Sequence, residues 1–387
     1  MSSDRPQLST ILVFAEYGLR NGGENSLLAV VQAMRNEPFR FVVACPDQTE
    51  LAEYLDAMRI EHVTWNLIGA DGVRRSQAEI REGIGQLIGR VKPDLIHCNS
   101  LSTSRLVGPI SNQLGLPAIG YLRDIIKLSR QAISDINQLA KLVAVSQATA
   151  DFHQQHGIQT DKLQVIFNGV DLETFSPRPP TGYLHKELSL PATTRLICCI
   201  GQIGMRKGTD DVIRAFLELE KQFEDLALVM VGTRNSKKDE AVEFEQRCHR
   251  LGIESNSNLF WLDRRTDVAD ILNESTLLLH GARQEPLGRV LLEALSVGCP
   301  FVATDVGGTA EIAVGLEDYQ VVCTVDSPES MAETATKLLV SEPLRAKLAR
   351  DCRKIATQRF DINDCMSKLS HLYRDTIDQI VAEPDAG

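Results

Sequence analysis

Two glutamates, Glu285 and Glu293, are the side chains whose type and spacing best suit the binding of a polar ligand. Carboxylates accept hydrogen bonds from hydroxyl groups, and these two lie eight positions apart. An α-helix makes one turn about every 3.6 residues. A helix that begins just after Glu285 therefore places Glu293 about two turns in, on a nearby face. The two carboxylates could therefore contact one extended ligand.

The apolar pattern predicts the elements that position these glutamates. Residues 276–279 form a short apolar run that is typical of a buried parallel strand, and residues 289–297 have a helical pattern that Gly298 ends. The loop between them opens onto the first turn of the helix. Backbone N–H groups and the positive end of the helix dipole favour an anion or the hydroxyl groups of a polar ligand there.

A second candidate segment is the glycine-containing loop 201–208, which carries Arg206 and Lys207. The apolar run 196–200 predicts a strand before this loop, and a helix is predicted from Thr209. Two cations at a helix start are badly placed against the helix dipole, so their presence favours an anionic ligand. A solvated Lys-Arg pair is the alternative interpretation.

The segment 285–300 combines the two glutamates with Pro-Leu-Gly after the first of them and Gly-Cys-Pro after the helix. It resembles the E-x7-E signature of the retaining nucleotide-sugar glycosyltransferases of family 4 (glycosyl transferases group 1), which have the GT-B fold. The resemblance implies that Glu285 and the backbone amides of Leu287 and Gly288 hold the donor sugar, while Glu293 holds the nucleotide ribose. Two solvated helix carboxylates are the alternative.

The phosphate and base contacts of the family can be carried over to five further residues. Lys207 matches the lysine of the family's phosphate-binding loop, whereas Gln202 replaces the usual arginine and Arg206 stands beside the lysine instead. Arg264 and Arg265 lie in the loop where the family holds the nucleotide base, although surface arginines would look the same. The resemblance implies a donor site for all five.

The first half of the chain also resembles the family, with one main departure. Gly22 and Gly23 stand where the family has a glycine pair that faces the donor diphosphate or the acceptor, and residues 168–171 match a family marker. Where the family commonly places a catalytic histidine before an aspartate, this chain has Arg123. Arginine is no general base near neutral pH, but its fork of donors can stabilise phosphate charge; pairing with a neighbouring acid is the alternative. In the second half, His280 and the residue after it replace the family's usual Pro-Ser.

Length and patterning predict two α/β domains. At 387 residues the chain exceeds the size at which single cores stop growing. Strand-like runs alternate with helical patterns at 11–15, 41–44, 62–66, 95–98, 118–122, 142–145, 164–167, 196–200, 226–231, 259–262 and 276–279. This alternation predicts doubly wound parallel sheets. With the resemblance, we expect a GT-B fold of two Rossmann-like domains facing across a cleft.

The expected domains are an acceptor-side Rossmann-like domain at 1–180, a nucleotide-sugar-binding domain at 181–360 and a helix at 361–387 that crosses back to the first domain. Ligands bind such sheets at the carboxyl ends of the strands. In the first domain the residues on that face are His97, Asn99, Ser100, Arg123, Asp124, Ser146, Asn168 and Gly169. For each one taken singly, a capping or turn role is the alternative.

Charge and composition exclude several classes of protein. The net charge is −11, of which the first 180 residues carry only −2, and an acidic chain without a basic stripe is a poor candidate for binding nucleic acid. No apolar run approaches the roughly 18 residues of a membrane span, and the polar first residues do not resemble a signal peptide, so a cytoplasmic location is expected. Arg74, Arg75 and Arg81 leave peripheral contact with an anionic membrane open, against a solvated helix face. Nine cysteines without a Cys-x-x-Cys pair indicate reduced thiols.

The resemblance implies a glycosyltransferase that moves a sugar from a UDP- or GDP-linked donor to an acceptor hydroxyl with retention, in polysaccharide or glycoconjugate synthesis. The acceptor could be linked to a lipid or a glycan. Because no Asp-x-Asp occurs in the sequence, neither a metal nor another cofactor is expected. Two alternatives stay open: another GT-B enzyme, such as a sugar phosphorylase or a nucleotide-sugar epimerase, and a catalytically weak sugar-nucleotide binding protein.

Overall fold

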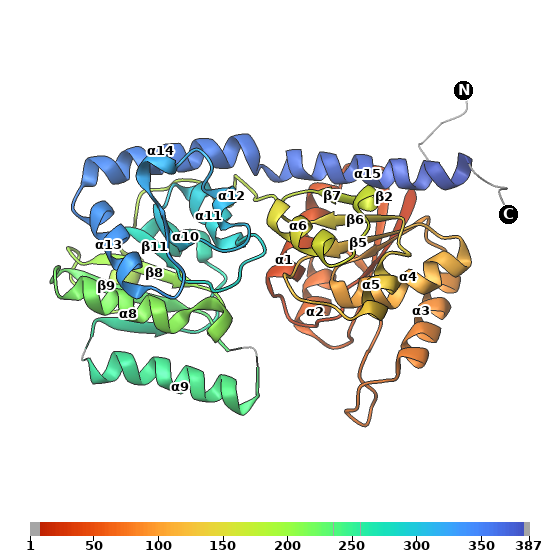
Figure 1. Ribbon diagram of the computed structural model, residues 1–387, viewed down its shortest axis with the longest axis horizontal. Helices are drawn as coiled ribbons and strands as arrows, with labels where there is room; N and C mark the ends of the chain where they lie inside the picture. The colour runs from red at the N-terminus through yellow and green to blue at the C-terminus, as the bar shows by residue number, and fades with distance from the viewer. Residues whose placement is uncertain (1–7, 235, 256, 383–387) are drawn as a thin grey trace. The chain divides into compact units, whose positions relative to one another are not determined.

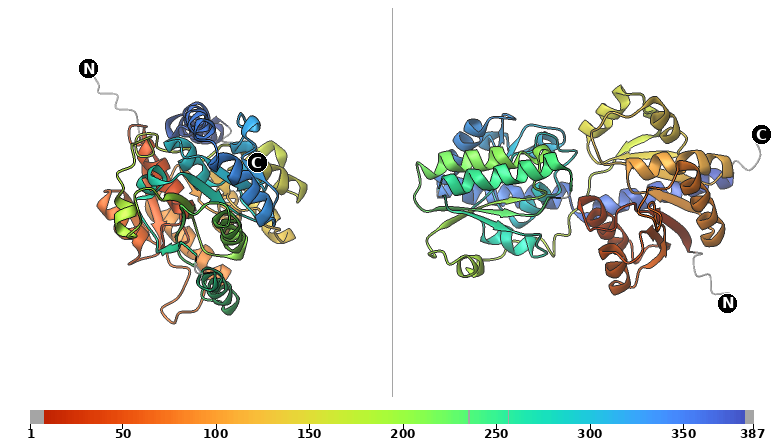
Figure 2. Two further views of the ribbon diagram at one scale, coloured as in Figure 1. Left: turned by 90° about the vertical axis from the view of Figure 1, so that its left-hand side faces the viewer. Right: turned by 90° about the horizontal axis from the view of Figure 1, so that it is seen from below.

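The computed structural model describes residues 8–234, 236–255 and 257–382, which form two compact units (Figure 1). The first unit contains the described residues up to Gly169 together with those from Ile362 onward, and the second contains Val170–Asp361. Each unit is built on one parallel sheet covered by helices, which Figure 2 shows from two further sides. The predicted doubly wound α/β architecture is confirmed in both units.

The first unit has a seven-stranded sheet in the order β3-β2-β1-β4-β5-β6-β7. Its strands are β1 (Ser9–Phe14), β2 (Phe39–Cys45), β3 (Glu61–Thr64), β4 (Leu95–Cys98), β5 (Ala118–Leu122), β6 (Lys141–Ala144) and β7 (Leu163–Val165). Its helices are α1 (Gly22–Ala33), α2 (Glu50–Ala57), α3 (Gln77–Val91), α4 (Leu101–Leu114), α5 (Arg130–Ile136), α6 (Gln147–Gln155) and α15 (Ile362–Ala382), with a 3-10 turn η1 (Thr160–Lys162).

The second unit has a six-stranded sheet in the order β10-β9-β8-β11-β12-β13. Its strands are β8 (Arg195–Ile200), β9 (Leu226–Val231), β10 (Leu259–Leu262), β11 (Leu277–His280), β12 (Phe301–Thr304) and β13 (Val322–Cys323). Its helices are α7 (Tyr183–Glu187), α8 (Thr209–Glu220), α9 (Asp239–Glu254), α10 (Val268–Glu274), α11 (Arg289–Val297), α12 (Thr309–Ile312), α13 (Pro328–Leu339) and α14 (Glu342–Arg359), with 3-10 turns η2 (Met205–Lys207) and η3 (Glu317–Tyr319).

The central strands explain why the sequence forms two parallel sheets. A parallel sheet with helices on both faces buries every side chain of its central strands, so those strands are continuous apolar runs. In β1 the residues from Ile11 to Phe14 are all buried, and in β9 all six residues from Leu226 to Val231 are buried. Among the strands and the loops that join them to the helices, charged residues therefore lie at the strand ends and in the loops, where a ligand can reach them.

All eleven predicted strands are present, with ends that differ by at most two residues. The sequence pattern missed β12 and β13, and β13 has only two residues, which is too short to give a periodic signal. The strand predicted at 276–279 is shifted by one residue and ends on His280. The predicted helix at 289–297 matches α11, and Gly298 ends it in the left-handed conformation with φ 73°.

The order of strands reverses at one point in each sheet. In the first unit β1 lies between β2 and β4, and in the second β8 lies between β9 and β11. The loops that leave two such neighbouring strands turn to opposite sides of the sheet and leave a crevice at its carboxyl edge. The loops after β1 and β4, and those after β8 and β11, are thus the places where the topology itself favours a ligand.

The boundary between the units lies at residue 169, earlier than the expected boundary at residue 180. The segment after Gly169 is held by the second unit. Val170 donates its N–H to the carbonyl of Phe360, and the guanidinium of Arg353 donates to the carbonyl of Phe175 at 2.8 Å. Further along, the carboxylate of Glu274 accepts hydrogen bonds from the backbone of 181 and 182.

The last helix, α15, belongs to the first unit (blue in Figure 1). The ring of Tyr373 packs edge-on against the ring of Phe39 with centroids 5.6 Å apart. Arg374 pairs with Glu37 at the surface of the same region. The chain therefore returns from the second unit and completes the core of the first.

Candidate active site

Glu285 is the centre of a charged cluster at the carboxyl edge of the second sheet. It lies in the loop between β11 and α11 and is only 5% exposed. Its Oε2 atom accepts a hydrogen bond from the ammonium group of Lys207, at the end of η2, and another from Nε2 of His280 at 3.0 Å. The topology that sets β8 beside β11 thus brings together the two loops that the sequence singled out.

The partners of Glu285 decide its charge. Burial acts to raise the pKa of Glu285, but the charge of Lys207 and the hydrogen bonds from His280 and Lys207 hold it well below its usual range. Burial lowers the pKa of His280 in spite of the neighbouring carboxylate. The cluster is therefore an ionised carboxylate between an ammonium group and a neutral imidazole.

Glycines let the two loops approach each other closely. Gly208 has a φ of +56°, and a Cβ atom there would lie 1.8 Å from the carbonyl oxygen of Gly281. The N–H of Arg283 also donates to the carbonyl of Arg206 at 2.9 Å. Any side chain at Gly208 would push the lysine loop away from the glutamate loop, so this glycine is needed to keep Lys207 in place.

Arg283 is a structural cation of this cluster that the sequence analysis did not single out. Its guanidinium group pairs with Asp210 at 2.9 Å, with Asp211 at 2.6 Å and with Asp326. The two aspartates are in the first turn of α8, where negative charge suits the helix dipole. In the sequence, Arg283 is marked as part of the cluster only by its position close to Glu285.

The other cations of the lysine loop and its neighbour are placed differently from Lys207. Arg206 is exposed and donates to the carbonyl of Gln284 at 3.2 Å, while Gln202 is half-buried after β8. In the loop after β10, Arg264 is exposed. Arg265 is held by Glu187 and Asp267 through contacts of 2.6 to 3.3 Å that engage both ends of its guanidinium group.

The residues that follow Glu285 lead directly into α11. Leu287 has a buried side chain, so only its backbone can meet a ligand, and Gly288 precedes the helix with a φ of +94°. Glu293 is 8% exposed and accepts a hydrogen bond from Nε of Arg289 at 2.7 Å. Burial raises the pKa of Glu293 against the charge of Arg289. Neither glutamate is a solvated surface carboxylate, so that alternative is wrong.

At the carboxyl edge of the first sheet, Arg123 is the central cation. Its Nε donates to the carbonyl of Asn99 at 3.1 Å, and its Nη1 donates to Oδ1 of Asn168 at 3.0 Å. The guanidinium group lies 4.2 Å from the ring centre of Tyr121. These residues follow β4, β5 and β7, so the structure brings together three of the side chains that the strand ends predicted.

The glycine pair lies beside this arginine. Gly22 and Gly23 begin α1, and a Cβ atom at Gly23 would lie 3.8 Å from Cδ of Arg123. Glu24 is buried next to them, and its burial raises its pKa while the charge of Arg123 opposes the shift. A buried carboxyl group thus lies within reach of the charge of the arginine.

Three further residues predicted on this face have structural roles. Ser100 and Ser146 accept hydrogen bonds from the backbone at the start of α4 and α6, as the capping alternative states. His97 is inside β4 and fully buried, stacked on Tyr121 and hydrogen-bonded to the hydroxyl of Tyr373. Burial, with the nearby charge of Arg123, lowers the pKa of His97 to about 3.

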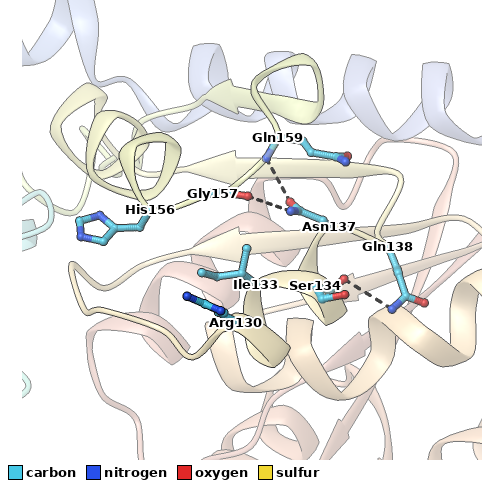
Figure 3. Close-up of a pocket in the computed structure, with 8 residues that line it drawn as sticks. All are labelled: Arg130, Ile133, Ser134, Asn137, Gln138, His156, Gly157 and Gln159. Atoms are coloured by element: carbon cyan, nitrogen blue, oxygen red, sulfur yellow. Dashed lines mark hydrogen bonds between the residues drawn. The ribbon is translucent and has the colours of Figure 1, made fainter.

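A groove of about 540 Å³ lies elsewhere on the first unit, between α5 and the end of α6 (Figure 3). Its lining residues are Arg130, Ile133, Ser134, Asn137, Gln138, His156, Gly157 and Gln159. Asn137 donates to the carbonyl of Gly157 at 2.9 Å and accepts from the N–H of Gln159 at 3.0 Å. The amide of Asn137 thus holds the loop that lines the groove, and none of the candidate residues is among the lining residues.

Metal-binding side chains, membrane-spanning helices and disulfides would each indicate other functions. No three His, Cys, Asp or Glu side chains in 8–234, 236–255 and 257–382 converge on a point that could hold a metal ion. Within the same ranges no helix has the length and apolar character needed to cross a membrane. All nine cysteines are free thiols, and eight of them are buried.

Two glycosyltransferase family models match successive parts of the chain. Glycosyltransferase Family 4 matches residues 20–174, and Glycosyl transferases group 1 matches residues 183–358. The two matches meet close to the boundary between the structural units and together contain every candidate residue named above.

Among similar proteins, a D-inositol 3-phosphate glycosyltransferase of Xylanimonas cellulosilytica is 27% identical over 240 residues, covering 60% of this chain and 56% of that protein. The lipopolysaccharide glucosyltransferase WaaG of Escherichia coli is 29% identical over 210 residues, covering 54% of each. The N-acetyl-alpha-D-glucosaminyl L-malate synthase of Bacillus anthracis is 27% identical over 215 residues, covering 56% of this chain and 54% of that protein. The chain thus spans little more than half the length of these relatives.

Solved structures share the fold over nearly the full chain. HepE from Anabaena, in complex with UDP-glucose, superposes with a TM-score of 0.82 at 21% identity, covering 95% of this chain and 99% of that one. The glycosyltransferase WaaG superposes with a TM-score of 0.70 at 19% identity, covering 94% of this chain and 99% of that one. Two Rossmann-like units in this order are the fold that these proteins have in common.

Proposed function

The chain belongs to the family 4 (group 1) glycosyltransferases with the GT-B fold, and we propose that it is a retaining enzyme which transfers a hexose from a nucleotide-sugar to an acceptor hydroxyl. The observation that carries this proposal is the cluster of Lys207, Glu285 and His280 at the carboxyl edge of the second sheet. It offers a cation and an oriented carboxylate side by side, as a sugar joined to a diphosphate requires.

The diphosphate of the donor is assigned to the lysine loop. Lys207 and Arg206 supply two positive charges within one turn, next to the entrance of α11. As charge builds on the leaving diphosphate in the transition state, a preorganised cation next to it lowers the barrier. HepE, which shares the fold, was solved with UDP-glucose, and a UDP-linked donor is the first candidate for this chain; a GDP-linked donor is the second.

The sugar and the ribose are assigned to the two glutamates. Oε2 of Glu285 is occupied by Lys207 and His280, which leaves Oε1 to accept from a hydroxyl group of the sugar. The backbone amides of Leu287 and Gly288 precede α11 and suit the same sugar. Glu293, about two turns further on, is assigned to the hydroxyl groups of the ribose.

The chemistry needs no nucleophile from the protein. In this proposal the bond from the anomeric carbon to the diphosphate breaks while the acceptor oxygen forms its bond on the same face. The leaving phosphate oxygen takes the acceptor proton. Because the new bond forms on the face that the diphosphate leaves, the configuration of the anomeric carbon is retained. The residues position the donor and stabilise the charge of the leaving group, without a metal ion. On the first unit, we assign contacts with the donor phosphate or with the acceptor to Gly22, Gly23 and Arg123.

The biological setting is proposed from the relatives and the thiols. One of the similar proteins is named a lipopolysaccharide glucosyltransferase, which supports synthesis of a polysaccharide or glycoconjugate here. Nine free cysteines suit a reducing compartment, so we place the enzyme in the cytoplasm. Lipid-linked and glycan-linked acceptors are both to be tried.

A thermal-shift screen of UDP-, GDP- and ADP-sugars tests the proposal first. A ligand present at about 100 times its dissociation constant should stabilise the protein by about 2.7 kcal/mol, which is a clear rise in Tm. The stabilising donor is then incubated with candidate acceptors, and NMR of the product reports the anomeric configuration. An inverted product would overturn retention, and phosphate acting as co-substrate would point to a sugar phosphorylase.

A further inference from the structure

His280 stands at a position where the resembled family usually has a proline, and the structure puts it in direct contact with the candidate carboxylate. It is the last residue of β11 and is 4% exposed. Its Nε2 lies 3.0 Å from Oε2 of Glu285. A proline has no side-chain donor, so this contact is a property of the present chain and not one that the resemblance implies.

The direction of this hydrogen bond follows from the chemistry of the two groups. An ionised carboxylate can only accept, so Nε2 of His280 must carry the hydrogen and donate it. Because burial lowers the pKa of His280, the ring is neutral and its other nitrogen carries no hydrogen. A neutral imidazole in one tautomer provides a donor of fixed direction.

The second donor to the same oxygen has another task in the proposed function, on which this inference rests. Lys207 has a flexible side chain with three donors, and it is assigned to the diphosphate as well as to Glu285. When a diphosphate is present, the ammonium group is shared between two anions. The ring of His280, by contrast, ends a buried strand, and in the part of the chain that the structure describes its anionic partner is Glu285.

We propose that His280 is a positioning residue that holds Oε2 of Glu285 and thereby keeps Oε1 turned toward the donor sugar while Lys207 serves the diphosphate. The geometry agrees with this assignment, since within the described part of the chain both donors reach Oε2 and no hydrogen bond to Oε1 is present. His280 does not touch the reacting atoms; it acts through Glu285.

Two substitutions separate positioning from simple filling of the core. His280→Gln keeps an N–H donor at about the same reach, whereas His280→Leu fills the space without a donor. We expect kcat to fall about tenfold in His280→Leu, as is typical for loss of a hydrogen bond to a charged group, and to stay within about threefold of the wild type in His280→Gln. The affinity for free UDP or GDP, which meets Lys207 and Glu293 but not Oε1 of Glu285, should stay unchanged in both.

A matched control comes from the same unit. Nε2 of His185 donates to the carbonyl of Thr194 at 2.8 Å, at the amino edge of the sheet, and His185→Leu removes a comparable imidazole hydrogen bond. Its kinetics should match the wild type. Equal losses of kcat in His280→Leu and His280→Gln would overturn the proposal, because core packing alone does not distinguish a donor from an apolar group.

The pH profile gives a second readout that packing would not change. The groups that face Glu285 are the charged Lys207 from η2 and the titratable ring of His280 from β11, with the charged Arg206 near that ring. Removing the donor at His280 should raise the pKa of Glu285, so that kcat in His280→Leu is lost at a higher pH on the acid side than in the wild type. His280→Gln should keep the wild-type profile, and a profile that is the same in all three would contradict the proposal.

The test also distinguishes failure of this inference from failure of the proposed function. If the wild type transfers sugar from no donor, the function is wrong, but the contact can still be tested by thermal unfolding as a function of pH. Glu285 has a lowered pKa in the folded chain, so its stabilisation is lost as pH falls. The loss begins near the unfolded pKa of a glutamate in both proteins, but in His280→Leu it should end at a higher pH and be smaller in total, a shift that should vanish in a Glu285→Gln background. A shift that persists there would overturn the contact.

Discussion

The carboxyl edges of the two sheets hold their central cations in different ways. In the second unit, Lys207 contacts an ionised, buried carboxylate, Glu285. In the first unit, Arg123 donates to a backbone carbonyl and to the side-chain amide of Asn168, both neutral. Removing the lysine takes a direct donor away from a buried charge, whereas the two hydrogen bonds of Arg123 named here end on neutral groups, whose loss costs less. The two edges should therefore respond differently to loss of the cation.

The largest effect is expected from Lys207→Ala. Loss of a preorganised cation at a leaving group commonly costs about 3 kcal/mol, so kcat should fall about a hundredfold, more than donor affinity falls. The variant should also lose stability, by about 2 kcal/mol, because Glu285 is left buried with one donor fewer. Steady-state kinetics and urea unfolding measure the two effects.

The control for this variant is Lys221→Ala, which removes a lysine of an exposed ion pair with Glu218. It should change neither kcat nor stability noticeably. A sharper version adds Glu285→Gln to Lys207→Ala: the double variant should regain part of the lost stability, since the stranded charge is gone. An unchanged kcat in Lys207→Ala would rule out its role at the diphosphate.

The next effect separates the two glutamates of the second unit. Glu285→Gln should lower kcat ten- to a hundredfold, or about 1.4 to 3 kcal/mol, and leave the affinity for free nucleotide normal, because its partner is the sugar. Glu293→Gln should mainly raise the donor KM by about tenfold, because a ribose contact is made equally before and during the reaction. Steady-state kinetics and calorimetry of UDP or GDP binding on both variants measure this difference. Small, equal changes in kcat and KM would contradict the assignment of the two glutamates.

A smaller effect is expected at the edge of the first unit. Arg123→Met should lower kcat about tenfold, and Arg123→Lys should fall between this variant and the wild type, because lysine keeps the charge without the fork. Neither should destabilise the protein as much as Lys207→Ala does, since the two hydrogen bonds of Arg123 described above go to neutral groups. Unfolding curves of the three variants compare the edges directly, and a larger stability loss at Arg123 would break the contrast drawn above.

The buried histidine of the first unit predicts how stability depends on pH. The folded pKa of His97 is about 3, below the unfolded value of about 6.5, so as pH falls below about 6.5 the unfolded chain gains a proton that the folded chain does not. Its contribution to stability is present above that pH and is lost on acidification, at up to about 1.4 kcal/mol per pH unit. Hydrogen exchange in the first unit should show that the free energy of unfolding falls less steeply with decreasing pH in His97→Leu than in the wild type. His371→Leu, an exposed histidine on α15, is the control and should keep the wild-type slope.

No effect at all is expected from removing metal ions. If Lys207 and Arg206 neutralise the diphosphate, turnover should be the same in EDTA as in buffer, in the wild type and in both edge variants. Loss of activity on chelation, restored by Mg²⁺ or Mn²⁺, would replace the lysine loop by a bound cation as the main source of charge.

Local sequence determined the elements and much of the candidate site. A helix from Arg289 to Val297 follows from its apolar spacing and from Gly298, the residue type that most easily adopts the left-handed conformation at a helix end. The strands follow from apolar runs, and the carboxyl ends of those strands predicted Asn99, Arg123 and Asn168 as neighbours. Each of these inferences uses interactions within about ten residues, or the one rule that parallel strands end at a common edge.

Tertiary structure alone decided which of these groups meet. Lys207 and Glu285 are 78 residues apart in the chain, and they touch because β8 and β11 are neighbours in the sheet, an order that no local pattern contains. The shift of β11 by one residue turned His280 from a loop residue into the end of a buried strand, where its ring faces Glu285. Burial then set the charges, because the same carboxyl group is ionised beside a lysine and would favour its neutral form if it were buried alone.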